Sequence, residues 1–95
     1  MPTRAKSHVL QDQRQVEAIS KRLKRAQGQM GAVIRMLEEG RGCEEVVTQM
    51  AAVSKAVNTA AFTMISASLK ECIEDASINH EDVTATLQRL FLSLA

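Results

Sequence analysis

From Cys43 to its last residue, Ala95, the chain contains neither glycine nor proline. The two residues that most often interrupt a helix are therefore missing from more than half of the sequence. The apolar side chains after residue 43 recur at intervals of three and four, the spacing of one helix face. They are Val46, Val47, Met50, Val53, Val57, Ala60, Ala61, Met64, Ile65, Leu69, Cys72 and Ile73. This pattern predicts one helix over about residues 43–76, too long to be buried by a single neighbour.

Two shorter helices are predicted on either side of it. Residues 1–12 are polar and aperiodic, and we expect a flexible N-terminal tail. Helical spacing then runs through Val16, Ile19, Leu23, Ala26, Met30, Val33, Ile34 and Leu37. It predicts a helix over residues 13–39 that Gly40 and Gly42 end. Asn79 is a candidate cap for a third helix, which would use Val83, Leu87, Leu90, Phe91 and Leu94. Residues 13–95 are thus expected to form a single all-α domain of three helices.

The composition favours an oligomer that binds a polyanion. The chain has no Trp or Tyr and only two Phe in 95 residues, so its own core is small. Residues 1–41 carry nine basic and four acidic side chains, whereas residues 42–95 carry three and seven. A basic half on a chain of net charge +1 suggests nucleic acid as a partner. The alternative is that these side chains only solvate a helix face.

The two cysteines cannot meet within one straight helix. Cys43 and Cys72 would lie roughly 40 Å apart at about 1.5 Å per residue, and a disulfide needs Cα atoms within roughly 7 Å. If two copies of the helix pack antiparallel about an axis between Val57 and Asn58, Cys43 of one chain faces Cys72 of the other. The small residues near Val57 would permit that close approach. The alternative is two unrelated buried thiols.

Several classes of protein are disfavoured by what the sequence lacks. No apolar run approaches membrane-spanning length and no signal-peptide pattern is present, so we expect a cytoplasmic protein with no membrane partner. Thiols stay reduced in that compartment. There is no Cys-x-x-Cys motif and no base adjacent to either cysteine. We therefore expect that the chain is not an enzyme.

Four runs of sequence together resemble the copper-sensitive operon repressor family. They are residues 22–29 (RLKRAQGQ), 38–43 (EEGRGC), 47–52 (VTQMAA) and 69–72 (LKEC). The resemblance covers about residues 16–92. It implies a three-helix subunit, an antiparallel four-helix-bundle homodimer and a homotetramer formed as a dimer of dimers. It also implies binding of double-stranded operator DNA without a helix-turn-helix, and release of that DNA when a sensor site is filled.

The resemblance assigns the basic residues as well. Arg22 and Arg25 match the family's basic motif, and Gln29 follows it. Arg14, Lys21 and Lys55 are further candidates for contacts with DNA phosphates. Lys55 is shifted by one position from the family's basic residue, whose place Ser54 takes.

Ser68 is where the sequence departs from the copper-sensing pattern. Those members carry a histidine four residues before the second cysteine, and here that position is Ser68. A hydroxyl is a poor ligand for Cu(I), which selects thiolate and imidazole. The remaining histidines, His8 and His80, are expected to be solvated surface groups, although His8 could swing in as a ligand.

A branch of the family keeps both cysteines and lacks that histidine, and this chain looks closest to it. The branch resembles the CstR-like repressors, which sense persulfides and polysulfides. We therefore expect no cofactor and no metal, with Cys43 and Cys72 as sensing thiols that form di-, tri- or polysulfide bridges between subunits. The alternative is a Cu(I)-responsive repressor that uses the same two cysteines.

Overall fold

The computed structural model describes residues 8–75 and 80–95, and within them the chain forms three helices and no strands. Helix α1 spans Gln13–Glu38, α2 spans Cys43–Glu74 and α3 spans His80–Leu94. The predicted all-α subunit is confirmed, with α2 ending two residues earlier than expected. The predicted cap Asn79 and residues 1–7 of the predicted tail lie outside the described residues.

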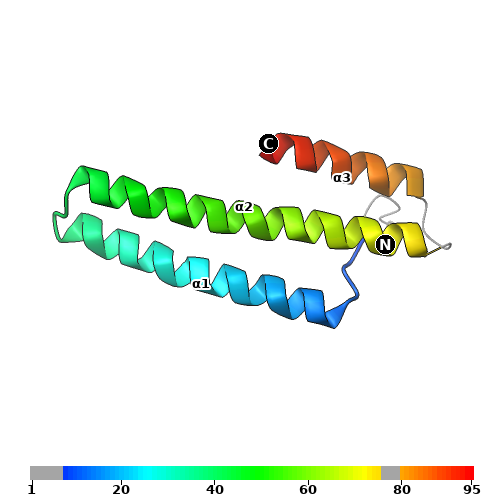
Figure 1. Ribbon diagram of the computed structural model, residues 1–95, viewed down its shortest axis with the longest axis horizontal. Helices are drawn as coiled ribbons and strands as arrows, with labels where there is room; N and C mark the ends of the chain where they lie inside the picture. The colour runs from blue at the N-terminus through cyan, green and yellow to red at the C-terminus, as the bar shows by residue number, and fades with distance from the viewer. Residues whose placement is uncertain (1–7, 76–79) are drawn as a thin grey trace, which may run out of the picture.

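Helices α1 and α2 form a long antiparallel hairpin (Figure 1). Asp12 begins α1, because its carboxylate accepts hydrogen bonds from the backbone N–H groups of Arg14 at 3.0 Å and Gln15 at 3.4 Å. Gly40 ends the hairpin's first arm with φ = +74°, a left-handed conformation that favours glycine. The expected helix stop after residue 39 is therefore confirmed.

The seam between α1 and α2 has a seven-residue repeat. The buried side chains at this spacing are Ile19, Ala26 and Val33 on α1 and Val46, Val53 and Ala60 on α2, and Met36 adds to them near the turn. Val33 and Val46 belong to one buried cluster near the turn, and Ile19 and Ala60 to a second near the far end. Both pairs have residue numbers that add to 79, so the register is constant along the hairpin.

Helix α3 folds back over the C-terminal half of α2 and does not contact α1 within the described ranges (Figure 1). Phe62 and Phe91 meet edge to face, with ring centroids 5.1 Å apart. Val83 is almost completely buried near the start of α3. The N-terminal half of α2 therefore has α1 as its only neighbour within the described part of the subunit.

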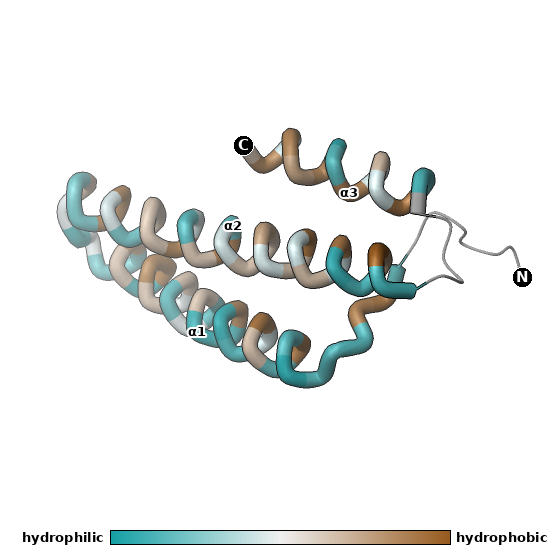
Figure 2. The backbone as a smooth tube through the Cα atoms, turned by 45° about the vertical axis from the view of Figure 1, so that its right-hand side comes forward, coloured by the Kyte–Doolittle hydropathy of each residue, from teal (hydrophilic) through white to brown (hydrophobic). Residues whose placement is uncertain are grey.

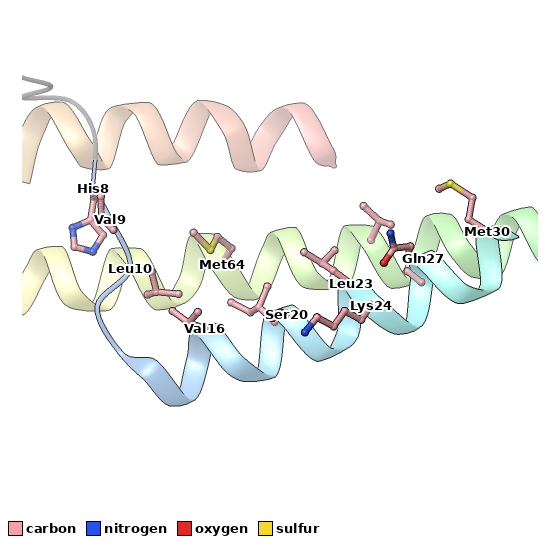
Figure 3. A pocket seen from close by; sticks show the side chains of 13 residues that line it. His8, Val9, Leu10, Val16, Ser20, Leu23, Lys24, Gln27, Met30 and Met64 are labelled. Carbon is pink, nitrogen blue, oxygen red and sulfur yellow. The ribbon is translucent and has the colours of Figure 1, made fainter.

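A continuous row of apolar side chains remains exposed, and we call it the apolar strip. It consists of Val16, Leu23, Met30 and Leu37 on α1 and Met50, Val57 and Met64 on α2. Members on each helix are seven residues apart, so each set stays on one side. Apolar turns recur along both helices in Figure 2. The strip lines two grooves, the larger of about 840 Å³ and lined by the residues drawn in Figure 3.

Candidate sensor and nucleic-acid sites

Cys43 is the first residue of α2, and its side chain is exposed. It lies among the free N–H groups of the helix start, with Glu44 and Glu45 in the same turn. Arg41 does not supply a free positive charge nearby. Its guanidinium is hydrogen-bonded to Glu45, and that carboxylate raises the pKa of Arg41 above its usual value.

Cys72 lies in the last turn of α2 and has no exposed surface. Burial raises the pKa of its thiol, and the negative charges of Glu71 and Asp75 raise that pKa further. At neutral pH the thiol form is therefore favoured more than in an ordinary cysteine. Ser68, one turn earlier, is buried too, with 3% of its surface exposed.

Both cysteines point to nearly the same side of α2. At about 100° per residue, the 29 positions between them leave Cys72 about 20° from Cys43 around the helix axis. Cys43 also continues the seven-residue spacing of Met50, Val57 and Met64 in the apolar strip. Within one subunit, however, the structure does not bring the thiols together, because almost the whole of α2 separates them.

Within the described ranges, no group of three or more His, Cys, Asp or Glu side chains could hold a metal ion. Cys72 has the hydroxyl of Ser68 as its neighbour on the preceding turn, in the place of an imidazole. A Cu(I) site built here would therefore rest on two thiolates from two subunits. Such a donor set suits Cu(I), whereas the Ser68 hydroxyl does not.

Residues 8–12 cross the end of α2 and are tied to it through Glu71 (Figure 3). One carboxylate oxygen of Glu71 lies 2.8 Å from His8 Nε2 and accepts the backbone N–H of Gln11 at 2.8 Å. The other accepts the backbone N–H of Asp12 at 2.7 Å. The hydrogen bond from Gln11 is the main cause that lowers the pKa of Glu71, with His8 and Asp12 adding to it.

His8 therefore differs from the solvated residue that the sequence suggests. Only 8% of its side chain is exposed, because it lies against α2 beside Glu71. Leu10 is buried in the cluster that contains Ile19 and Ala60. The last five residues of the predicted tail are thus packed against the helical domain, since Leu10 gives them an apolar anchor.

Three of the basic residues of α1 form a row on its exposed side. Arg14, Lys21 and Arg25 lie within about 40° of one another around the helix axis, and all three are exposed. Arg22, also exposed, lies next to this row. A row of cations at helical spacing matches what DNA phosphates would contact.

Gln29 and Lys55 are placed differently from that row. Gln29 is half-buried, and its side-chain oxygen is buried with no protein partner, so it is less accessible than Arg22 or Arg25. Lys55 follows Val53, which packs against α1, by two positions. It therefore points about 200° away, to the far side of α2. Within one subunit the structure does not bring Lys55 together with the basic residues of α1.

The described subunit thus carries a row of cations on α1 and two thiols at opposite ends of α2. The chain belongs to the metal-sensitive transcriptional repressor family, whose sequence model matches residues 15–92. Members of a repressor family regulate transcription, which confirms the expectation that the chain is not an enzyme.

Two curated relatives match part of the chain. The copper-sensing transcriptional repressor RicR of Mycobacterium tuberculosis is 36% identical over 62 residues, or 65% of this chain and 65% of RicR. The uncharacterized protein YrkD of Bacillus subtilis is 38% identical over 47 residues, or 50% of this chain and 75% of YrkD. No solved structure matches. No helix in the described ranges is long and apolar enough to cross a membrane.

Proposed function

We propose that this chain is a cytoplasmic repressor that binds operator DNA and senses reactive sulfur species through Cys43 of one subunit and Cys72 of another. The observation that carries the proposal is the placement of the two thiols on one side of α2, with a buried Ser68 beside Cys72. That side is also the side of the apolar strip, where a second copy would pack.

An antiparallel homodimer is the assembly that this side of α2 supports. Pairing about an axis between Val57 and Asn58 places Cys43 opposite Cys72 of the partner and Met50 opposite Ile65. The exposed apolar strip gives such a dimer a surface to bury, at about 25 cal/mol per Å² of apolar area. Two equivalent thiol pairs then arise from one two-fold axis. A homotetramer of two such dimers would carry four rows of basic α1 residues for contact with DNA.

The sulfur chemistry proceeds in two balanced steps. The thiolate of Cys43 attacks the outer sulfur of a low-molecular-weight persulfide, RSSH, so that Cys43 becomes a persulfide and RSH leaves. The thiolate of the partner subunit's Cys72 then attacks the inner sulfur of that persulfide. A disulfide forms between the subunits and hydrogen sulfide leaves with the proton. If both thiols are first persulfidated, the same condensation gives a trisulfide and one hydrogen sulfide.

Cross-linking would act on DNA binding through the geometry of the dimer. Two covalent bridges fix α2 against its partner and thereby shift the basic rows on α1. A hundredfold loss of DNA affinity needs about 2.7 kcal/mol of coupling, which is within the usual range for allosteric proteins.

A Cu(I) signal is the second candidate, because the relative RicR is described as copper-sensing. The thiolates of Cys43 and the partner subunit's Cys72 would hold the ion. The Ser68 hydroxyl in place of an imidazole weighs against this reading, since it leaves only two soft ligands.

One experiment separates the two signals. The reduced protein is treated with a persulfide donor or with Cu(I) plus a competing chelator, and DNA affinity is then measured by fluorescence anisotropy. Mass spectrometry without reductant should reveal a cross-linked dimer that holds a disulfide or added sulfur after the donor. Cys72→Ala protein should keep its DNA affinity in the presence of the donor. DNA release by copper alone, with no response to the donor, would favour the second candidate.

A further inference from the structure

We propose that Glu71 is a positioning residue that holds residues 8–12 as a strap over the end of α2, and that this strap keeps Cys72 from reacting until it opens. The inference rests on the proposed role of Cys72 as a sensing thiol. The strap itself is defined by the segment His8–Asp12 and its three hydrogen bonds to Glu71.

The strap continues the packing of α1 beyond the point where α1 begins. Facing pairs along the hairpin have residue numbers that add to 79, as in Val33 with Val46 and Ile19 with Ala60. His8 and Glu71 obey the same rule, 2.8 Å apart. In this register α1 starts opposite residue 66 of α2, so it does not reach the level of Cys72. Residues 8–12 occupy that place instead.

Glu71, to which the strap is bonded, directly precedes Cys72, and α3 packs along the same half of α2. Figure 3 shows the segment with His8 and Val9 running from α1 across α2 toward α3. Without it, the last two turns of α2 would project beyond α1 with one flank open to solvent. Cys72 has no exposed surface in the single subunit, so its burial requires no partner, and we attribute that burial to the strap together with α3.

The strap is held by polar contacts that can break one at a time. Three donors converge on one carboxylate, and only Leu10 adds a buried apolar side chain. Val9, by contrast, is 72% exposed. Hydrogen bonds to a charged group are stronger than neutral ones but remain reversible. Loss of the Glu71 contacts would free the segment while the α1–α2 seam stays intact.

The strap also lies where Cys43 of the partner would have to approach. In the proposed dimer the partner's thiol arrives on the side of α2 that carries Cys72, which is closed in the single subunit. Opening of the strap therefore comes before the bond between subunits forms. The exposed Cys43 needs no such step, so it is the thiol that meets an incoming persulfide first.

Alkylation of the thiols tests the strap without any sulfur donor or DNA. Reduced full-length protein is treated with iodoacetamide at pH 8, quenched over time, and both cysteines are read in the same sample by peptide mass spectrometry. We expect Cys72 to be alkylated at least tenfold more slowly than Cys43. Glu71→Ala should raise the Cys72 rate about tenfold while the Cys43 rate stays within twofold. His8→Ala, which removes one of the three contacts, should give a smaller rise.

Three controls keep the result decisive. Glu74→Gln removes a carboxylate that lies about one helical turn after Glu71 and makes none of the strap's hydrogen bonds. The alkylation rate of Cys72 should therefore not change. Glu71→Gln keeps an acceptor oxygen and should restore part of the protection. A Cys43→Ala background should leave Cys72 protected, because the strap belongs to the same subunit.

An unchanged Cys72 alkylation rate in Glu71→Ala, or an equal rise at both cysteines, would overturn the proposed strap. Failure of donor-induced cross-linking with these rates as expected would overturn only the proposed function.

Discussion

Cys43 and Cys72 point to nearly the same side of α2, yet the first thiol is exposed and the second is fully buried. The two thiols therefore differ in solvent exposure within a single subunit, before any partner or signal is bound. The difference has a direct chemical consequence, because only a thiolate reacts and burial disfavours it.

The two cysteines should have different pH profiles of alkylation. Burial raises the pKa of Cys72, so its thiolate fraction should still be rising at pH values where an ordinary thiol, with a pKa of about 8.5, has levelled off. The measurement is the iodoacetamide rate at each cysteine between pH 7 and 10. A Cys72 profile that levels off below pH 8 would contradict the expectation.

Acid should weaken the strap through Glu71. Its pKa is lowered in the folded protein, so the folded state binds fewer protons than the unfolded state near the carboxyl's usual pKa of about 4.3. This contribution to stability is present above that pH and is lost as the pH falls through the lower, folded value. His8 and the carboxylates of Glu74 and Asp75 border the same hollow. Urea unfolding at pH 6 and pH 3.5 should reveal a smaller acid-induced loss in Glu71→Gln than in the natural sequence.

Leu10 should contribute measurably to stability although it precedes α1. It is 6% exposed and packs with Ile19 and Ala60, so Leu10→Ala should lower the free energy of unfolding by about 2 kcal/mol. The matched control is Val9→Ala, which should change it by less than about 0.5 kcal/mol because the side chain is exposed. Urea titrations monitored by circular dichroism give both values. Equal effects of the two substitutions would mean that the segment is not packed in solution.

The apolar strip should hold the dimer together. Met30→Glu places a charge in the middle of the strip and should shift the protein toward monomer in sedimentation velocity, while circular dichroism remains helical. Ala18→Glu adds the same charge on a different side of α1 and should leave the assembly intact. A Met30→Glu protein that sediments like the natural one would place the interface elsewhere.

The row of cations on α1 should set the salt dependence of DNA binding. Arg25→Ala and Lys21→Ala should each reduce the slope of log K against log salt by about 1, as expected for one lost phosphate contact. Arg89→Ala, on α3, is the charge-matched control. Lys55→Ala decides whether the far side of α2 also faces DNA. Unchanged slopes for both α1 variants would remove α1 from the interface.

The helices could be predicted from the sequence because their signals are local. Spacing of apolar residues located all three helices, and Gly40 and Gly42 located the turn. Asp12 as the cap of α1 also follows a local preference for a short acidic side chain. Such signals act over a few residues and need no knowledge of which helices meet.

The strap could not be predicted in the same way. Its bonds join residues about 60 positions apart, and neither the polar character of residues 1–12 nor the charge of Glu71 marks them as partners. One signal was available: Val9 and Leu10, just before Gln13, are adjacent apolar side chains in a polar stretch, and a leucine there needs somewhere to be buried. Lys55 is a candidate because it lies one position from the family's basic residue, and such a match does not say to which side of α2 the side chain points.

Asp12 connects the strap to the first turn of α1. Its side chain fixes the first turn of α1, and its backbone N–H is held by Glu71. Arg14, the first cation of the basic row, follows two residues later. A displacement at the end of α2 would therefore reach the start of α1, the helix proposed to face DNA, through Asp12 of the same subunit, in addition to any path across the proposed dimer. Cys72, the proposed sensing thiol, and Arg14, the first candidate phosphate contact, are thus linked through Glu71 and Asp12, although they lie 58 positions apart in the sequence.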